Sequence, residues 1–74
     1  MIKEQFGLKT EFIDLLQLLK ATGYAATGGE AKMMVEDGLI AVNGEQESRK
    51  RRKLRLDDEV NIDGQVLIVL VTSG

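Results

Sequence analysis

The first third of the chain combines a short alternating segment with apolar residues at helical spacing. Residues 2–6 alternate loosely between apolar and polar side chains, which predicts a first strand. Thr10 is a typical helix cap, and Gly23 is a typical residue to end the helix that follows. The apolar positions of that helix recur at i, i+3, i+4 and i+7, and they are Phe12, Leu15, Leu16 and Leu19.

A second helix is predicted from a capping box. The Thr27 side chain can accept a hydrogen bond from the Glu30 N–H, while the Glu30 side chain reaches back to the Thr27 N–H. Gly38 is expected to end this helix, whose core face is Ala31, Met34 and Val35. Gly28 and Gly29 weaken its first turn. Either a ligand or backbone approaches there, or the turn packs tightly against the first helix.

The second half of the chain changes to the pattern of strands and tight turns. Residues 39–42 lead into Asn43-Gly44, a strong hairpin signal, and residues 60–62 alternate before a second turn at Asp63-Gly64. Residues 66–71 form an apolar closing strand. The pattern predicts an α+β fold for a single domain, 1–74, with two N-terminal helices packed on a small antiparallel sheet.

Charge adds one feature that this pattern lacks. Six of the ten basic residues lie between positions 49 and 55, and the four remaining lysines face twelve carboxylates. We call residues 49–55 the basic segment; its cations are Arg49, Lys50, Arg51, Arg52, Lys53 and Arg55. Clustered like charges repel unless an anion lies opposite. Arginine and lysine both bind phosphate oxygens, so a nucleic-acid backbone is the predicted partner.

Two observations work against that interpretation. The pI of about 5.0 lies far below that of most nucleic-acid-binding domains. The segment could also be a solvated loop balanced by the acidic turn at residues 57–59. However, salt screens charges beyond roughly 8 Å, so distant carboxylates barely weaken the local field. Leu54 and Leu56 are expected to anchor the segment to the sheet.

Composition excludes several function classes. With no histidine or cysteine, the chain lacks the commonest general base and metal ligand and has no thiolate nucleophile, and we expect no catalytic residue, metal or cofactor. Residues 57–59 could hold magnesium, but a solubilising turn is the simpler interpretation. The longest apolar run has six residues and the N-terminus lacks a signal sequence, so a cytoplasmic protein without a membrane span is predicted.

Single residues outside the basic segment add less. Lys32 lies near the start of the second helix, where a bound phosphate would offset its unfavourable position in the helix dipole, although it could simply pair with Glu36. Aromatic residues make up 4% of the chain, and Phe6 and Phe12 are interpreted as core. We therefore expect no base-stacking platform and favour binding to a structured RNA.

Residues 27–44, which end in Val42-Asn43-Gly44, and residues 56–60 resemble the S4 RNA-binding domain. The chain is most similar to short, free-standing bacterial S4-like proteins, which carry a Gly-Gly-x-Ala-Lys segment, matched by 28–32, and an Arg/Lys-rich run, matched by 49–53. The resemblance covers roughly residues 12–71. It implies a non-catalytic module that binds a structured RNA, such as ribosomal or transfer RNA, through Lys32, Asn43 and the basic segment.

The chain departs from the S4 pattern along the second helix, and another function stays open. Many S4 domains carry basic residues where this chain has Gly28, Met33, Glu36 and Asp37, so the loop must supply most of the attraction. The alternative is a protein-interaction module whose basic loop docks on an acidic partner. The first helix favours it, because apolar residues on more than one face could leave some exposed: Ile13, Leu15, Leu16, Leu18 and Leu19.

Overall fold

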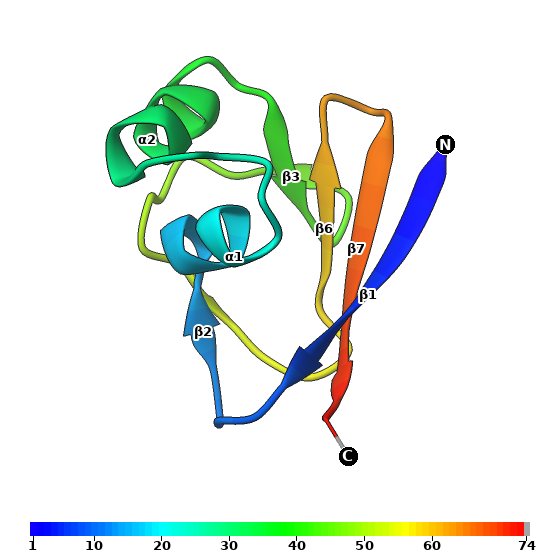
Figure 1. The fold of residues 1–74 in the computed structure, drawn as a ribbon. Coiled ribbons are helices and arrows are strands. Elements are labelled where there is room, and N and C mark those ends of the chain that lie inside the picture. Colours follow the sequence, from blue (N-terminus) through cyan, green and yellow to red (C-terminus); the bar gives the residue numbers. More distant parts are fainter. Residues whose placement is uncertain (74) are drawn as a thin grey trace.

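The computed structural model describes residues 1–73, which form two helices and seven strands (Figure 1). In chain order the elements are β1 (Ile2–Leu8), β2 (Ile13–Asp14), α1 (Leu15–Ala21), α2 (Gly28–Glu36), β3 (Ile40–Val42), β4 (Glu45–Gln46), β5 (Lys53–Leu54), β6 (Glu59–Ile62) and β7 (Val66–Thr72). Neither described helix is long and apolar enough to cross a membrane.

The main sheet is mixed, so the predicted antiparallel sheet is wrong. Its strand order is β1-β7-β6-β3-β4, and β1 runs parallel to β7 from the pair Ile2↔Val66 to the pair Leu8↔Thr72. The other neighbours are antiparallel. The α+β class itself holds, but strands contain more residues than helices. Periodicity identified β1 as a strand, but it cannot give the direction of pairing, because the partner strand β7 lies beyond both helices and five other strands.

A second sheet of two strands was not predicted. β2 pairs antiparallel with β5 through Ile13↔Leu54 and Asp14↔Lys53. Both strands have only two residues, too few for a period-2 signal. This pairing places the end of the basic segment beside the start of α1.

The helices pack together on one side of the main sheet (Figure 1). Leu15, Leu18 and Leu19 of α1 are fully buried, and Ala31 and Val35 of α2 are buried with them. They meet the sheet residues Ile40, Val42, Val60, Ile68 and Leu70 in one core. The remaining apolar side chains near α1, Ile13 and Leu16, are also partly buried against this core. The exposed apolar surface that favoured a protein-interaction module is therefore absent from α1.

The caps of the two helices differ in how well the sequence predicted them. The Asp14 carboxylate accepts a hydrogen bond from Gln17 N at 2.9 Å, so α1 begins at Leu15, and the expected cap at Thr10 is wrong. The preceding residues are extended because they pair with β5. For α2 the predicted cap is confirmed, since Thr27 Oγ1 accepts from Glu30 N at 3.1 Å.

The glycines and turn residues lie where the sequence placed them. Gly23 and Gly38 follow the helices with φ of 84° and 75°, a conformation that glycine adopts without strain. The Asn43-Gly44 turn joins β3 to β4 with positive φ at both positions, and Asp63-Gly64 does the same between β6 and β7. Both predicted hairpins are confirmed.

Candidate nucleic-acid interface

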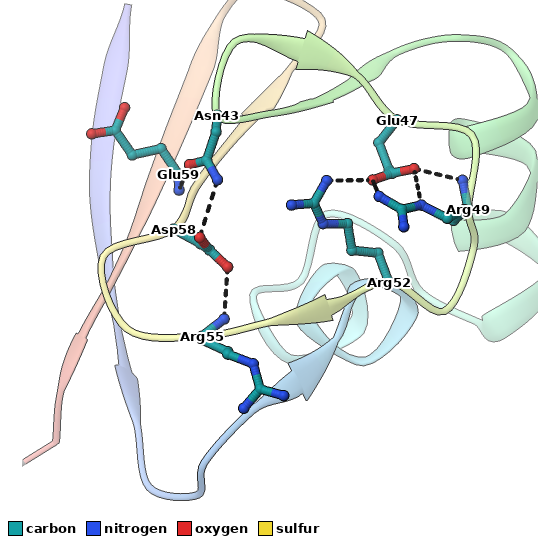
Figure 2. A network of polar contacts seen from close by, with 7 residues as sticks. All are labelled: Asn43, Glu47, Arg49, Arg52, Arg55, Asp58 and Glu59. Carbon is teal, nitrogen blue, oxygen red and sulfur yellow. Dashed lines mark hydrogen bonds and ion pairs between the residues drawn. The ribbon is translucent and has the colours of Figure 1, made fainter.

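The basic segment follows β4, an edge strand of the main sheet, and runs into β5 of the two-stranded sheet (Figure 2). Its path is fixed at both ends by backbone hydrogen bonds, from Glu47 N to Ile40 O at 2.9 Å and from Leu15 N to Arg52 O at 2.9 Å. Leu54 is fully buried and anchors the segment as expected. Leu56 is 49% exposed, so the second predicted anchor is wrong.

A buried carboxylate organises the first half of the segment. Glu47 is 5% exposed, and it accepts hydrogen bonds from Arg49 N, Nε and Nη2 at 2.9, 3.1 and 3.1 Å (Figure 2). Arg52 Nη1 donates a further bond at 2.8 Å. The bonds from Arg49, and then the one from Arg52, lower the pKa of Glu47 to about 2 against the opposing effect of burial. Glu47 was not predicted as a site residue, because its only signal in the sequence is a carboxylate next to clustered arginines.

Two more carboxylates reach the segment, one from the end of α2 and one from β2, directly before α1. Lys50 Nζ lies 2.7 Å from Glu36 Oε1 at the end of α2, and this ammonium lowers the pKa of Glu36. Arg51 Nη2 lies 3.8 Å from Asp14 Oδ2, but the Arg51 side chain remains 82% exposed. Internal anions therefore offset part of the repulsion within the segment. The repulsion alone does not require an external ligand.

At the other end of the segment, two cations lie close to an aromatic ring. Lys53 Nζ lies 4.8 Å and Arg55 Cζ 5.7 Å from the centroid of the Phe12 ring. Phe12 is 38% exposed, so its predicted place in the core is wrong. Because Ile13 and Leu54 turn their side chains toward the core, the flanking Phe12, Lys53 and Arg55 face outward.

The cations surround two open hollows. Arg49, Arg51, Arg52 and Lys53 line one of about 460 Å³. Arg51 also borders a second hollow of about 200 Å³, which runs to α1 and the start of α2 and is lined by Asp14, Leu16, Gln17, Lys20 and Gly28. Lys20 was not selected from the sequence, because a lone exposed lysine carries no signal. This surface can accept an extended chain of negative charges.

The glycines at the start of α2 border open space. A Cβ atom at Gly28 would meet nothing within 4 Å, and one at Gly29 would meet only Thr27 Oγ1, at 3.8 Å. Tight packing against α1 is therefore not the reason for them. Lys32 is exposed in the same helix, and its charge makes a minor contribution to the lowered pKa of Glu36.

The Asn43 side chain makes hydrogen bonds that connect its own turn to a neighbouring one. Its Nδ2 donates to Asp58 Oδ1 at 3.0 Å and its Oδ1 accepts from Glu59 N at 2.9 Å (Figure 2). Asp58 also accepts from Arg55 N at 2.8 Å. The Asn43 side chain thus joins the β3–β4 turn to the turn that follows the basic segment.

Replacing Asn43 tests this structural role. Asn43→Gly keeps the positive φ of 52° accessible but removes both side-chain hydrogen bonds. We expect it to lower the free energy of unfolding by about 1–2 kcal/mol. Urea denaturation measures the change, with the exposed turn residue Asp63→Gly as the control for added chain entropy. Equal losses in the two variants would contradict a special role for the Asn43 side chain.

Comparison with known proteins places this architecture in a family. The S4 domain model matches residues 6–70. The chain is 39% identical over 58 residues to the probable ribosome maturation protein RlbA of Bacillus subtilis (strain 168), covering 78% of this chain and 82% of RlbA. It is 32% identical over 62 residues to YbcJ of Escherichia coli (strain K12), covering 84% and 89%.

Solved structures agree with the sequence matches. The solution structure of Escherichia coli YbcJ has a TM-score of 0.63 at 33% identity, with 93% of this chain and 87% of that chain covered. The 30S ribosomal protein S4e of Thermoplasma acidophilum has a TM-score of 0.58 at 25% identity, and the match covers 76% of this chain and 30% of S4e. The family model spans most of the sequence, and YbcJ shares the fold over most of its length. The chain therefore belongs to the S4 domain family.

Proposed function

We propose that this chain is a non-catalytic RNA-binding protein that contacts the phosphate backbone of a structured RNA through its basic segment. The observation that carries the proposal is the hollow lined by four cations, which shares Arg51 with the second hollow at the start of α2. The RNA-binding residues would be Arg49, Lys50, Arg51, Arg52, Lys53 and Arg55, with Lys32 flanking them and Asn43 shaping the neighbouring turn.

The geometry gives these cations different roles. Glu47 holds Arg49 and Arg52 in fixed positions, yet each guanidinium has five N–H donors and keeps some for phosphate oxygens. Arg51 is the most exposed of the paired cations. Lys53 and Arg55, which flank the buried Leu54 in the chain, are also exposed. A preorganised arginine loses less side-chain entropy when it binds, and this gain offsets part of the positive charge that Glu47 neutralises.

The relatives favour ribosomal RNA as the target. The name of RlbA refers to ribosome maturation, and the YbcJ structure was described as revealing a motif involved in RNA binding. We propose that this chain acts in the cytoplasm as a single RNA-binding domain, 1–74, on a ribosomal RNA segment or on transfer RNA.

Salt dependence tests the proposal. If about four phosphates are neutralised on a helical RNA, log affinity should fall with log salt at a slope of roughly −3 to −4, because bound counterions are released. Fluorescence anisotropy with a labelled ribosomal RNA hairpin and a transfer RNA, between about 50 and 200 mM salt, measures the slope. A flat response, or no binding at the lowest salt, would sink the proposal.

A further inference from the structure

Phe12 differs from the other aromatic residues in its surroundings. Phe6 packs partly against the core, and Tyr24 is half-buried with its hydroxyl donating to Glu4. Phe12 instead lies on the outward face of the β2–β5 ribbon, 38% exposed. A single exposed aromatic residue is ordinary on a protein surface. An exposed ring with two cations of the basic segment close to it is a more specific arrangement.

That arrangement matches the requirements of an unpaired nucleotide. Its base needs a flat apolar surface to stack on, and its two neighbouring phosphates need cations. Phe12 supplies the surface, while Lys53 Nζ and Arg55 Cζ lie 4.8 and 5.7 Å from the ring centroid. Both are within the reach of cation–π attraction, which is weak where water screens it.

We propose that Phe12 stacks against an unpaired base of the bound RNA, while Lys53 and Arg55 contact the phosphates on either side. The inference rests on the proposed function and adds a single-stranded element to its target. A base stacked on an aromatic ring is generally held more strongly than an exposed cation over the same ring, so the base displaces one cation. The displaced cation moves to a phosphate, and its electrostatic attraction is kept.

The proposal predicts which RNA is preferred. In a duplex the bases stack on each other and are closed to the ring, whereas loops and bulges can present a free base. The protein should therefore favour a hairpin with an unpaired loop over a duplex with the same number of phosphates. The basic segment alone would bind both about equally.

Three defined RNAs test this by anisotropy: a hairpin with an unpaired uridine loop, the same hairpin with abasic loop nucleotides, and a fully paired duplex of equal charge. We expect Phe12→Ala to weaken binding to the uridine hairpin about 10-fold and to leave the other two within about 2-fold. The salt slope should not change, because no cation is removed. Thermal melting checks that the variant stays folded.

A fluorescent variant reports contact directly. The chain has no tryptophan, so Phe12→Trp introduces a single tryptophan at the proposed platform, and its fluorescence can be excited apart from that of Tyr24. The uridine hairpin should quench it and the abasic hairpin should not. Ile2→Trp is the matched control, because Ile2 is also an exposed apolar residue but lies at the start of β1, away from β2 (Figure 1).

The outcomes separate the two proposals. If the wild type binds all three RNAs equally with a steep salt slope, and none of them changes the fluorescence of the Phe12→Trp variant, then Phe12 is not a platform but the backbone-binding function stands. If none of the RNAs is bound in a salt-dependent way, the proposed function fails, and the stacking role fails with it.

Discussion

Reversing the charges of Arg51 and Lys53 together is expected to weaken RNA binding on the order of 100-fold, the largest effect expected for surface residues of this protein. Both side chains line the larger hollow, and both are exposed. Each reversal removes one phosphate contact and places a carboxylate near the RNA. The slope of log affinity against log salt should become shallower by about 2.

The choice of these two residues follows from the structure. Arg52 is the adjacent alternative, but its Nη1 lies 2.8 Å from Glu47 Oε1, so a glutamate there would face a buried carboxylate and threaten folding. Arg51 lies 3.8 Å from Asp14 and is mostly exposed, so Arg51→Glu should fold normally. Anisotropy on a ribosomal RNA hairpin measures the loss, and circular dichroism confirms folding.

The control is Lys3→Glu, which changes the net charge as much as either single reversal but lies exposed on β1. It should alter affinity by less than about 3-fold, since screening limits its reach. If Lys3→Glu weakens binding as much as Arg51→Glu, the basic segment is not the contact surface and only net charge matters.

Replacing Glu47 with glutamine is expected to lower the free energy of unfolding by about 2–3 kcal/mol at neutral pH. The carboxylate is almost fully buried and accepts four hydrogen bonds from Arg49 and Arg52. A neutral amide lacks the charge that attracts both guanidinium groups. Its NH2 group would also face the N–H donors of the two arginines and could not accept their hydrogen bonds. Glu45→Gln, an exposed carboxylate on β4, is the matched control and should stay within about 0.5 kcal/mol of wild type.

The same residue predicts how wild-type stability depends on pH. The pKa of Glu47 is lowered from 4.5 to about 2 in the folded protein, so the unfolded chain takes up this proton first as the pH falls. The stabilisation is complete above about pH 4.5 and is lost progressively toward pH 2. Urea titrations across this range should show that the free energy of unfolding falls steeply with decreasing pH in wild type and in Glu45→Gln, and less steeply in Glu47→Gln. An equal pH dependence in all three proteins would show that Glu47 is not a major acid-sensitive group.

The Glu47 cluster changes how the acidic composition of the chain is understood. Clustered cations on an acidic protein suggested an external anion, but Glu47, Glu36 and Asp14 already pair with four of the six. These pairs hold the segment in one shape before any ligand arrives. RNA would compete most easily for Lys50 and Arg51. Their partners, at the end of α2 and just before α1, are more exposed than Glu47, so these pairs are weaker.

Features set by neighbouring residues could be predicted from the sequence. The Thr27 cap of α2, the glycines that end both helices and the two hairpin turns depend on interactions over a few positions, so local chemistry decided them. The six cations were evident because they are adjacent, and the S4 resemblance was evident because its motifs are contiguous. The fold class and the main candidate surface follow from these features.

Features that join distant parts of the chain were decided by the tertiary structure. β1 pairs parallel to β7 across a long stretch of intervening chain, and the pairing of β2 with β5 moves the cap of α1 from Thr10 to Asp14. The same short ribbon turns Phe12 outward, and the loop closes over Glu47. Periodicity cannot report these effects, because whether a side chain is buried, paired or exposed depends on which distant segment packs against it.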